Sequence, residues 1–117
     1  MSKQILIALR NPVEGKEQEF NDSYDNQHIP DVLALPGCLS AQRFKLSVDQ
    51  IPGWPPPHRY LAIYEFESET LALTVKTFLE RAGTPAPRRI DGVARDTTFL
   101  TAFFEPLGPK IEKTRPE

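Results

Sequence analysis

The residues with the clearest chemical potential are a histidine and a tyrosine four positions apart. His28 follows Tyr24 by one helical turn, so the two side chains share one face of a predicted helix. An imidazole exchanges protons near neutral pH, and a phenol hydroxyl donates or accepts a hydrogen bond. This pair therefore has the chemistry of a proton-transfer site. The alternative is a structural histidine that bonds a backbone carbonyl where Pro30 interrupts the helix.

Two acidic residues flank this histidine at three-residue spacing. Asp25 precedes His28, and Asp31 follows it, which is one pattern of a facial metal site. Because Pro30 disrupts the helical alignment and no second histidine lies nearby, we expect solvated carboxylates or helix caps here and no metal. Asp31 is also placed to orient the imidazole or to contact a substrate.

Further candidates lie on predicted strands and in one loop. The Arg43 guanidinium would bind a carboxylate or enolate oxygen, or pair with an acidic residue of the first helix. The Tyr64 hydroxyl would polarise a substrate carbonyl, whereas Tyr60 is expected to pack. Trp54 lies in a stiff apolar loop that would either cover a hydrophobic ligand or cross a partner subunit. The prolines of this loop are Pro52, Pro55, Pro56 and Pro57.

Other motifs add little chemistry. Cys38 is expected to be an inert buried thiol. Arg88, Arg89 and Arg95 lie in one predicted loop, where they would attract an anionic substrate or stay solvated. The sequence has no glycine-rich phosphate loop, no Gly-x-Ser-x-Gly elbow and no dinucleotide fingerprint. Nucleotide-dependent and serine hydrolase chemistry are therefore not supported.

Length and composition limit the class of protein. The 117 residues fit one domain, and 39% hydrophobic with 26% charged residues suffice for a core and a solvated surface. A net charge of −2 lacks the basic stripe of a nucleic-acid binder. No apolar run is long enough to span a membrane, and the N-terminus has no signal-peptide pattern. With one cysteine and hence no internal disulfide, we expect a cytoplasmic protein without nucleic-acid or membrane partners.

Hydrophobic periodicity predicts the order strand, helix, strand, strand, helix, strand. The segments are 4–10, 17–28, 38–46, 59–66, 69–81 and 97–105, with Ser68 as a helix N-cap and a short extra helix over 30–35. This is the split βαβ order of an α+β, ferredoxin-like domain with a four-stranded antiparallel sheet. We expect the domain to occupy residues 1–106, and residues 107–117, which are rich in proline, to form a mobile tail.

Both faces of this sheet are largely apolar. In the strand over 59–66, Leu61 and Ile63 face away from Ala62 and Tyr64. Two helices cover one face only, and exposed apolar surface costs roughly 25 cal/mol per Å². The sequence therefore predicts a homodimer that packs sheet to sheet about a two-fold axis.

The first helix and the turn after it resemble one known group. The stretch Tyr24-Asp25-Asn26-Gln27-His28-Ile29-Pro30, followed by Pro36-Gly37, is similar to the Tyr/Trp-x-x-x-His-x-Pro signature of EthD-like and related uncharacterised members of the dimeric α+β barrel superfamily. The resemblance implies a dimeric barrel with a small-molecule pocket between the helices and the sheet. Superfamily members include cofactor-free monooxygenases, muconolactone isomerases, polyketide cyclases and haem enzymes.

Residues and resemblance together predict a small enzyme that needs no cofactor. It would act on a hydrophobic, aromatic or polyketide-like carbonyl compound as an isomerase, cyclase, lyase or monooxygenase. His28 would be the acid and base, with Tyr24 and Tyr64 at the enolate oxygen; the substrate contacts would be Asp31, Arg43 and Trp54. One alternative is a non-catalytic binding or accessory protein of a catabolic pathway. Another is a haem-binding protein with His28 as axial ligand.

Overall fold

A four-stranded sheet and one layer of helices make up the part of the chain that the computed structural model describes, residues 2–54, 56–81 and 90–114. The elements are β1 (Ser2–Arg10), α1 (Glu17–Ser23), η1 (Tyr24–His28), α2 (Ile29–Leu33), β2 (Cys38–Lys45), β3 (Tyr60–Ser68), α3 (Leu71–Arg81) and β4 (Leu100–Phe104). The strands form one antiparallel sheet in the order β2-β3-β1-β4. This confirms the ferredoxin-like βαββαβ prediction. The prediction for Arg88 and Arg89 lies outside the described residues, as does the end of the tail, 115–117.

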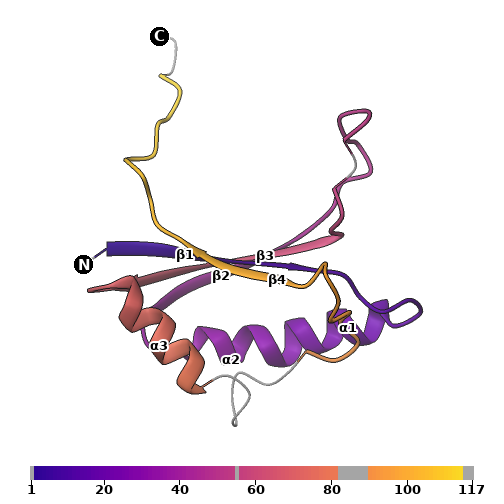
Figure 1. The fold of residues 1–117 in the computed structure, drawn as a ribbon, viewed down its shortest axis with the longest axis horizontal. Helices are drawn as coiled ribbons and strands as arrows, with labels where there is room; N and C mark the ends of the chain where they lie inside the picture. Colours follow the sequence, from indigo (N-terminus) through magenta and orange to yellow (C-terminus); the bar gives the residue numbers. More distant parts are fainter. Residues whose placement is uncertain (1, 55, 82–89, 115–117) are drawn as a thin grey trace.

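All helices lie on one face of the sheet, and two extended segments rise from the other face (Figure 1). We call them the proline arm, residues 46–59 between β2 and β3, and the C-terminal arm, residues 105–114 after β4. Neither arm contains a helix or strand among its described residues. The expectation that residues 107–117 are mobile stays a prediction.

The core lies between the sheet and the helices. Strand β3 alternates as predicted, because Ala62, Tyr64 and Phe66 are buried toward the helices. Strand β1 is buried on its helix side only. Ile7 and Leu9 are half-buried, because they alternate with the buried Leu6 and Ala8 and therefore point to the face that has no helix. The core contains Leu6, Ala8, Phe20, Tyr24, Val32, Leu35, Tyr60, Ala62, Tyr64, Phe66, Ile90 and Val93.

The predicted interruption at Pro30 is wrong, because α1, η1 and α2 form one continuous helical run. Proline has no N–H to donate, and its ring would clash with the carbonyl one turn back. The chain accommodates it by widening one turn: the Ile29 N–H donates to the Tyr24 carbonyl, five residues back. This π-helical turn, a form frequent at functional sites, contains both Tyr24 and His28.

The start of α3 differs from its prediction as well. Ser68 is the last residue of β3 and not the helix cap. Instead the Thr70 hydroxyl accepts a hydrogen bond from the Leu73 N–H at 3.2 Å, which satisfies one of the unpaired N–H groups of the first turn. Both residues have the short hydroxyl side chain of a good cap, so the pattern alone could not choose between them.

Gly37 lies in the turn between α2 and β2, where the chain passes close to the end of β3. Its φ is +86°, and an added Cβ would lie 2.7 Å from the Glu67 carbonyl oxygen. Gly53 in the proline arm also has a φ of +86°, but nothing lies within 4 Å of its added Cβ. We expect Gly53→Ala to lower the free energy of unfolding by about 1–2 kcal/mol because of left-handed strain, and Gly37→Ala to lower it by at least about 2 kcal/mol more because of the added clash. Urea unfolding of both variants measures the difference, and equal costs would contradict the close approach to β3.

Candidate functional site

Two tyrosine hydroxyls meet in the interior between η1 and β3. Tyr24 and Tyr64 are each 1% exposed, and their hydroxyl oxygens are 3.5 Å apart. That separation is well beyond the usual 2.7–2.8 Å of a hydroxyl hydrogen bond, so the contact is weak. Burial raises the pKa of Tyr64 far above its ordinary value, and the neighbouring Tyr24 raises it further. Tyr64 is therefore a neutral phenol, which is a hydrogen-bond donor and not a base.

Arg43 packs against the Tyr24 ring of this pair. Its guanidinium lies over the Tyr24 ring, 4.3 Å from the centroid. The Nη1 atom donates to Asp25 Oδ1 at 2.8 Å, and Nη2 donates to Asn21 Oδ1 at 2.8 Å. The expected pairing of Arg43 with an acidic residue of the first helix is therefore confirmed. Because Arg43 is on β2 and its partners are on the helical run, the contact fixes the Tyr24 ring between them.

His28 joins the same cluster through a contact with the Tyr24 ring. The two rings pack edge to face, with centroids 5.2 Å apart, and His28 is half-buried. Asp31 is half-buried in the first turn of α2, three residues later. Of the six predicted site residues, the structure thus brings together His28, Tyr24, Tyr64 and Arg43. Trp54 is separate, because the proline arm rises from the opposite face of the sheet.

Arg10 belongs to this interior, and sequence reasoning missed it. It is 5% exposed, and its guanidinium donates to the Leu100 carbonyl at 2.5 Å and to Thr101 Oγ1 at 2.6 Å. Phe99 stacks on it at 3.7 Å. Burial lowers the pKa of Arg10, whereas the nearby Tyr24 and Tyr64 favour its charged form.

The Arg10 charge is incompletely compensated. Its Nε atom is buried and has no hydrogen-bond partner, and none of the ion pairs found among the described residues includes Arg10. A buried cation without a carboxylate is costly. The sequence feature that indicates its burial is alternation along β1, because Arg10 follows Leu6 and Ala8 on the helix-facing side of the strand.

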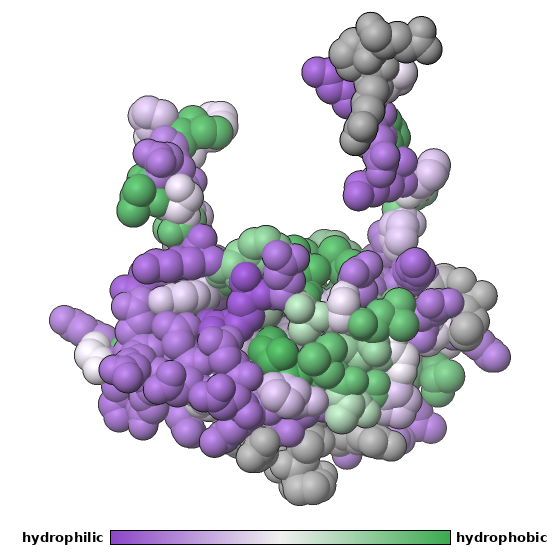
Figure 2. Space-filling view, turned by 180° about the vertical axis from the view of Figure 1, so that it is seen from behind, coloured by the Kyte–Doolittle hydropathy of each residue, from purple (hydrophilic) through white to green (hydrophobic). Residues whose placement is uncertain are grey.

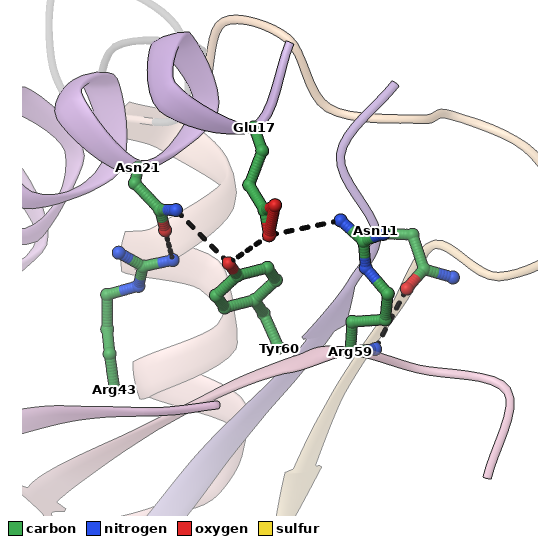
Figure 3. Close-up of polar contacts among 6 residues, drawn as sticks. All are labelled: Asn11, Glu17, Asn21, Arg43, Arg59 and Tyr60. Atoms are coloured by element: carbon green, nitrogen blue, oxygen red, sulfur yellow. Dashed lines mark hydrogen bonds and ion pairs between the residues drawn. The ribbon is translucent and has the colours of Figure 1, made fainter. Parts of the chain in front are cut away.

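A second polar network ties α1 to the sheet (Figure 3). The Tyr60 hydroxyl donates to Glu17 Oε2 at 2.5 Å and accepts from Asn21 Nδ2 at 3.2 Å. Arg59 donates to the same Glu17 oxygen at 3.2 Å. Tyr60 is buried, as its expected packing role requires, so this network positions α1 over β3.

The remaining candidates have structural contacts. Burial raises the pKa of the Cys38 thiol, which fits the expected inert thiol. The His58 ring is half-buried, and its Nε2 lies 2.7 Å from the Thr98 carbonyl oxygen at the base of the proline arm. Within the described ranges, no three metal-binding side chains gather. No helix found there has the length and apolar character needed to cross a membrane.

An apolar hollow of about 390 Å³ lies at the base of the proline arm, on the helix-free side of the sheet. We call it the arm-base hollow. Its apolar walls come from β1, β2, β3 and the arm, and they include Leu9, Phe44, Leu46, Pro56 and Leu61. This hollow is distinct from the tyrosine cluster, because the sheet lies between them.

Comparison with known proteins identifies the fold. The structure is similar to the crystal structure of an ethyl tert-butyl ether (EthD) family protein from Bacillus halodurans, with a TM-score of 0.51 and 15% identity over 92% of this chain and 100% of that one. The chain has the EthD-family fold. The resemblance carried by the Tyr24 to Pro30 signature is therefore confirmed at the level of fold. No family model matches the sequence, and no curated protein matches it.

The network on this EthD fold predicts a pH-dependent contribution to stability. The hydrogen bond from Tyr60 is the main cause that lowers the pKa of Glu17 below its ordinary value of 4.5. A carboxyl whose pKa is lowered by folding stabilises the fold above its unfolded pKa, and this contribution disappears as the pH falls through the folded value. Tyr60→Phe should therefore be destabilising at pH 7, and its difference from the wild type should shrink as the pH falls below 4.5.

Urea unfolding between pH 7 and pH 3 measures this difference. Tyr64→Phe is the matched control, because its hydroxyl contacts Tyr24 and no carboxylate in the described structure. The cost of Tyr64→Phe should stay constant over the acid range. A Tyr60→Phe cost that is also constant would mean that the phenol does not stabilise the Glu17 carboxylate.

Proposed function

We propose that this protein is a small enzyme that needs no cofactor and transfers a proton next to a carbonyl group. The observation that carries the proposal is the pair of buried tyrosine hydroxyls, Tyr24 and Tyr64, whose 3.5 Å contact leaves both poorly satisfied. Buried polar groups normally have good partners. A substrate oxygen between or beside these hydroxyls would supply one.

The surrounding charges suit an oxygen that becomes negative during the reaction. A phenol with a raised pKa, Tyr64, can donate a hydrogen bond to a carbonyl without losing its proton. The incompletely compensated guanidinium of Arg10 would favour the enolate over the neutral ketone. Both groups act in an interior of low dielectric, where electrostatic interactions are stronger than in water.

The proposed step moves one proton and one electron pair. His28 takes the proton from the carbon next to the carbonyl, and the electrons of the broken C–H bond form the enolate. The protonated imidazole then returns the proton to the same or another carbon. Return to another carbon gives isomerisation, and attack of the enolate carbon on a second carbonyl gives cyclisation. Arg43 would position Tyr24 through the stacked contact, and Asp31 is proposed as a substrate contact.

We further propose that the enzyme is a cytoplasmic homodimer with a hydrophobic, aromatic or polyketide-like substrate. The Phe20 ring packs against Tyr24 and the surrounding core is apolar, so a substrate that reaches the tyrosine hydroxyls would be an apolar compound. The helix-free apolar face supports the dimer. Oxygenation is a second outcome of the same enolate with a suitable substrate. A non-catalytic binding protein would use the same hydroxyls without proton transfer.

Hydrogen exchange tests the reaction without knowledge of the natural substrate. We would incubate the full chain with small aromatic ketones and lactones in D2O and measure deuterium at the α carbon by mass spectrometry. The wild type should exchange at least one compound faster than buffer. His28→Ala should lower that rate by about 100-fold or more, and Tyr64→Phe by a similar factor.

His58→Ala is the matched control, because His58 is the only other histidine in the sequence. It should leave the exchange rate unchanged. An exchange rate unaffected by His28→Ala would remove this residue from the mechanism. Binding of a compound that gains no deuterium would favour the non-catalytic alternative.

A further inference from the structure

The two arms leave the sheet at opposite ends but on the same face. Ile5 pairs with Phe104, so the C-terminal arm begins beside the start of β1. Arg10 pairs with Tyr60, so the proline arm ends beside the far end of β1. Both rise away from the helices (Figure 1). Together with the sheet they form three sides of an open cradle.

Apolar side chains on these arms contact little of their own chain. Val48, Ile51 and Trp54 of the proline arm, and Leu107 and Ile111 of the C-terminal arm, are all at least 63% exposed. The radius of gyration is 16.0 Å, whereas a closed domain of this length would have about 13 Å. The arms therefore hold apolar groups in water at a distance from the core, which is costly for a single chain.

The floor of the cradle is apolar as well. Side chains from all four strands face it, and Phe44, Leu100 and Phe104 are at least 40% exposed there. Hydrophobic surface is visible between the bases of the two arms (Figure 2). The arm-base hollow opens on this side, where an apolar side chain from outside would fit.

We propose that both arms clasp a second copy of this chain and supply about half of the contact between the two copies. This inference rests on the homodimer proposed above. Four strands about 4.8 Å apart, each about seven residues long with a rise of about 3.4 Å per residue, give a floor of roughly 450 Å². A stable interface needs about 800 Å² from each partner. The floor alone falls short, and the arms are the apolar surface that adjoins it.

The chemistry of the arms favours a second copy over a charged partner. The described part of the C-terminal arm has Glu105, Lys110, Glu112 and Lys113, so its charges balance and it would attract neither a nucleic acid nor an anionic membrane. In a two-fold pair each copy provides two arms and receives two. Trp54 would thereby cross the partner subunit, and it would not cover the tyrosine cluster of its own chain.

Light scattering after size-exclusion chromatography tests the inference with the full chain. The wild type should have about twice the 13.3 kDa of one chain. We would make one double variant in each arm: Ile51→Ser with Trp54→Ser in the proline arm, and Leu107→Ser with Ile111→Ser in the C-terminal arm. Each double variant should raise the dissociation constant of the dimer by about 30-fold or more. The control is Leu73→Ser with Leu79→Ser on α3, where both leucines are at least 51% exposed but lie in the helical layer. It should leave the dissociation constant unchanged.

The possible results distinguish the proposed role of the arms from the existence of the dimer. A wild type that stays monomeric at micromolar concentration would overturn both proposals. A wild-type dimer whose dissociation constant does not change in either arm variant would overturn the clasp alone. Arm variants that unfold would be replaced by a cross-linking measurement on Trp54→Cys in a Cys38→Ser background, with isotope-labelled and unlabelled chains mixed. With a reagent that joins a thiol to a lysine amine, cross-links between labelled and unlabelled chains are expected, and cross-links from the introduced thiol only to lysines of its own chain would overturn the clasp.

Discussion

One layer of helices covers one face of a four-stranded sheet, and this protein has apolar side chains on both faces. The covered face becomes the core, where Phe20, Tyr24 and Val32 pack against β1 and β3. The other face retains half-exposed residues such as Leu100 and Phe104. Because exposed apolar area is costly in proportion to its size, this asymmetry drives the rest of the architecture. Both arms rise from the uncovered face, and the proposed second copy would cover it.

The order of elements was predictable because it depends on local patterns. Alternation in β3 and the four-residue spacing of Phe20, Tyr24 and His28 each describe one segment at a time. What the sequence did not reveal depends on contacts between segments. Pro30 was expected to end the helix, but packing of α2 against the core keeps the run continuous, and a π turn absorbs the missing N–H. Arg10 was overlooked because a charged residue at the end of an apolar strand normally points to solvent.

The candidate site also combines contacts that local spacing predicts with contacts that only the fold brings about. Tyr24 and His28 were paired from spacing alone, and their rings do pack together. The contact between Tyr24 and Tyr64 joins η1 to β3, forty residues later, so only the fold could bring it about. Trp54 had two interpretations that sequence could not separate, a lid over a ligand or a strap across a partner. The direction in which the proline arm leaves the sheet excludes a lid over the tyrosine cluster of its own chain, because the sheet lies between them.

Strand β1 connects the two surfaces, because its alternate residues serve both. Arg10 points to the tyrosine cluster, and its guanidinium is held by the carbonyls of Leu9 and Leu100. The side chains of those same leucines face the helix-free side, where the second copy would pack. Cover on that side would restrict the backbone that holds the guanidinium, since a packed strand has less freedom than an exposed one. In the proposed dimer, the contact between the copies and the position of the buried cation would be coupled through these two carbonyl groups, and a weakened dimer would loosen the site without any change in its residues.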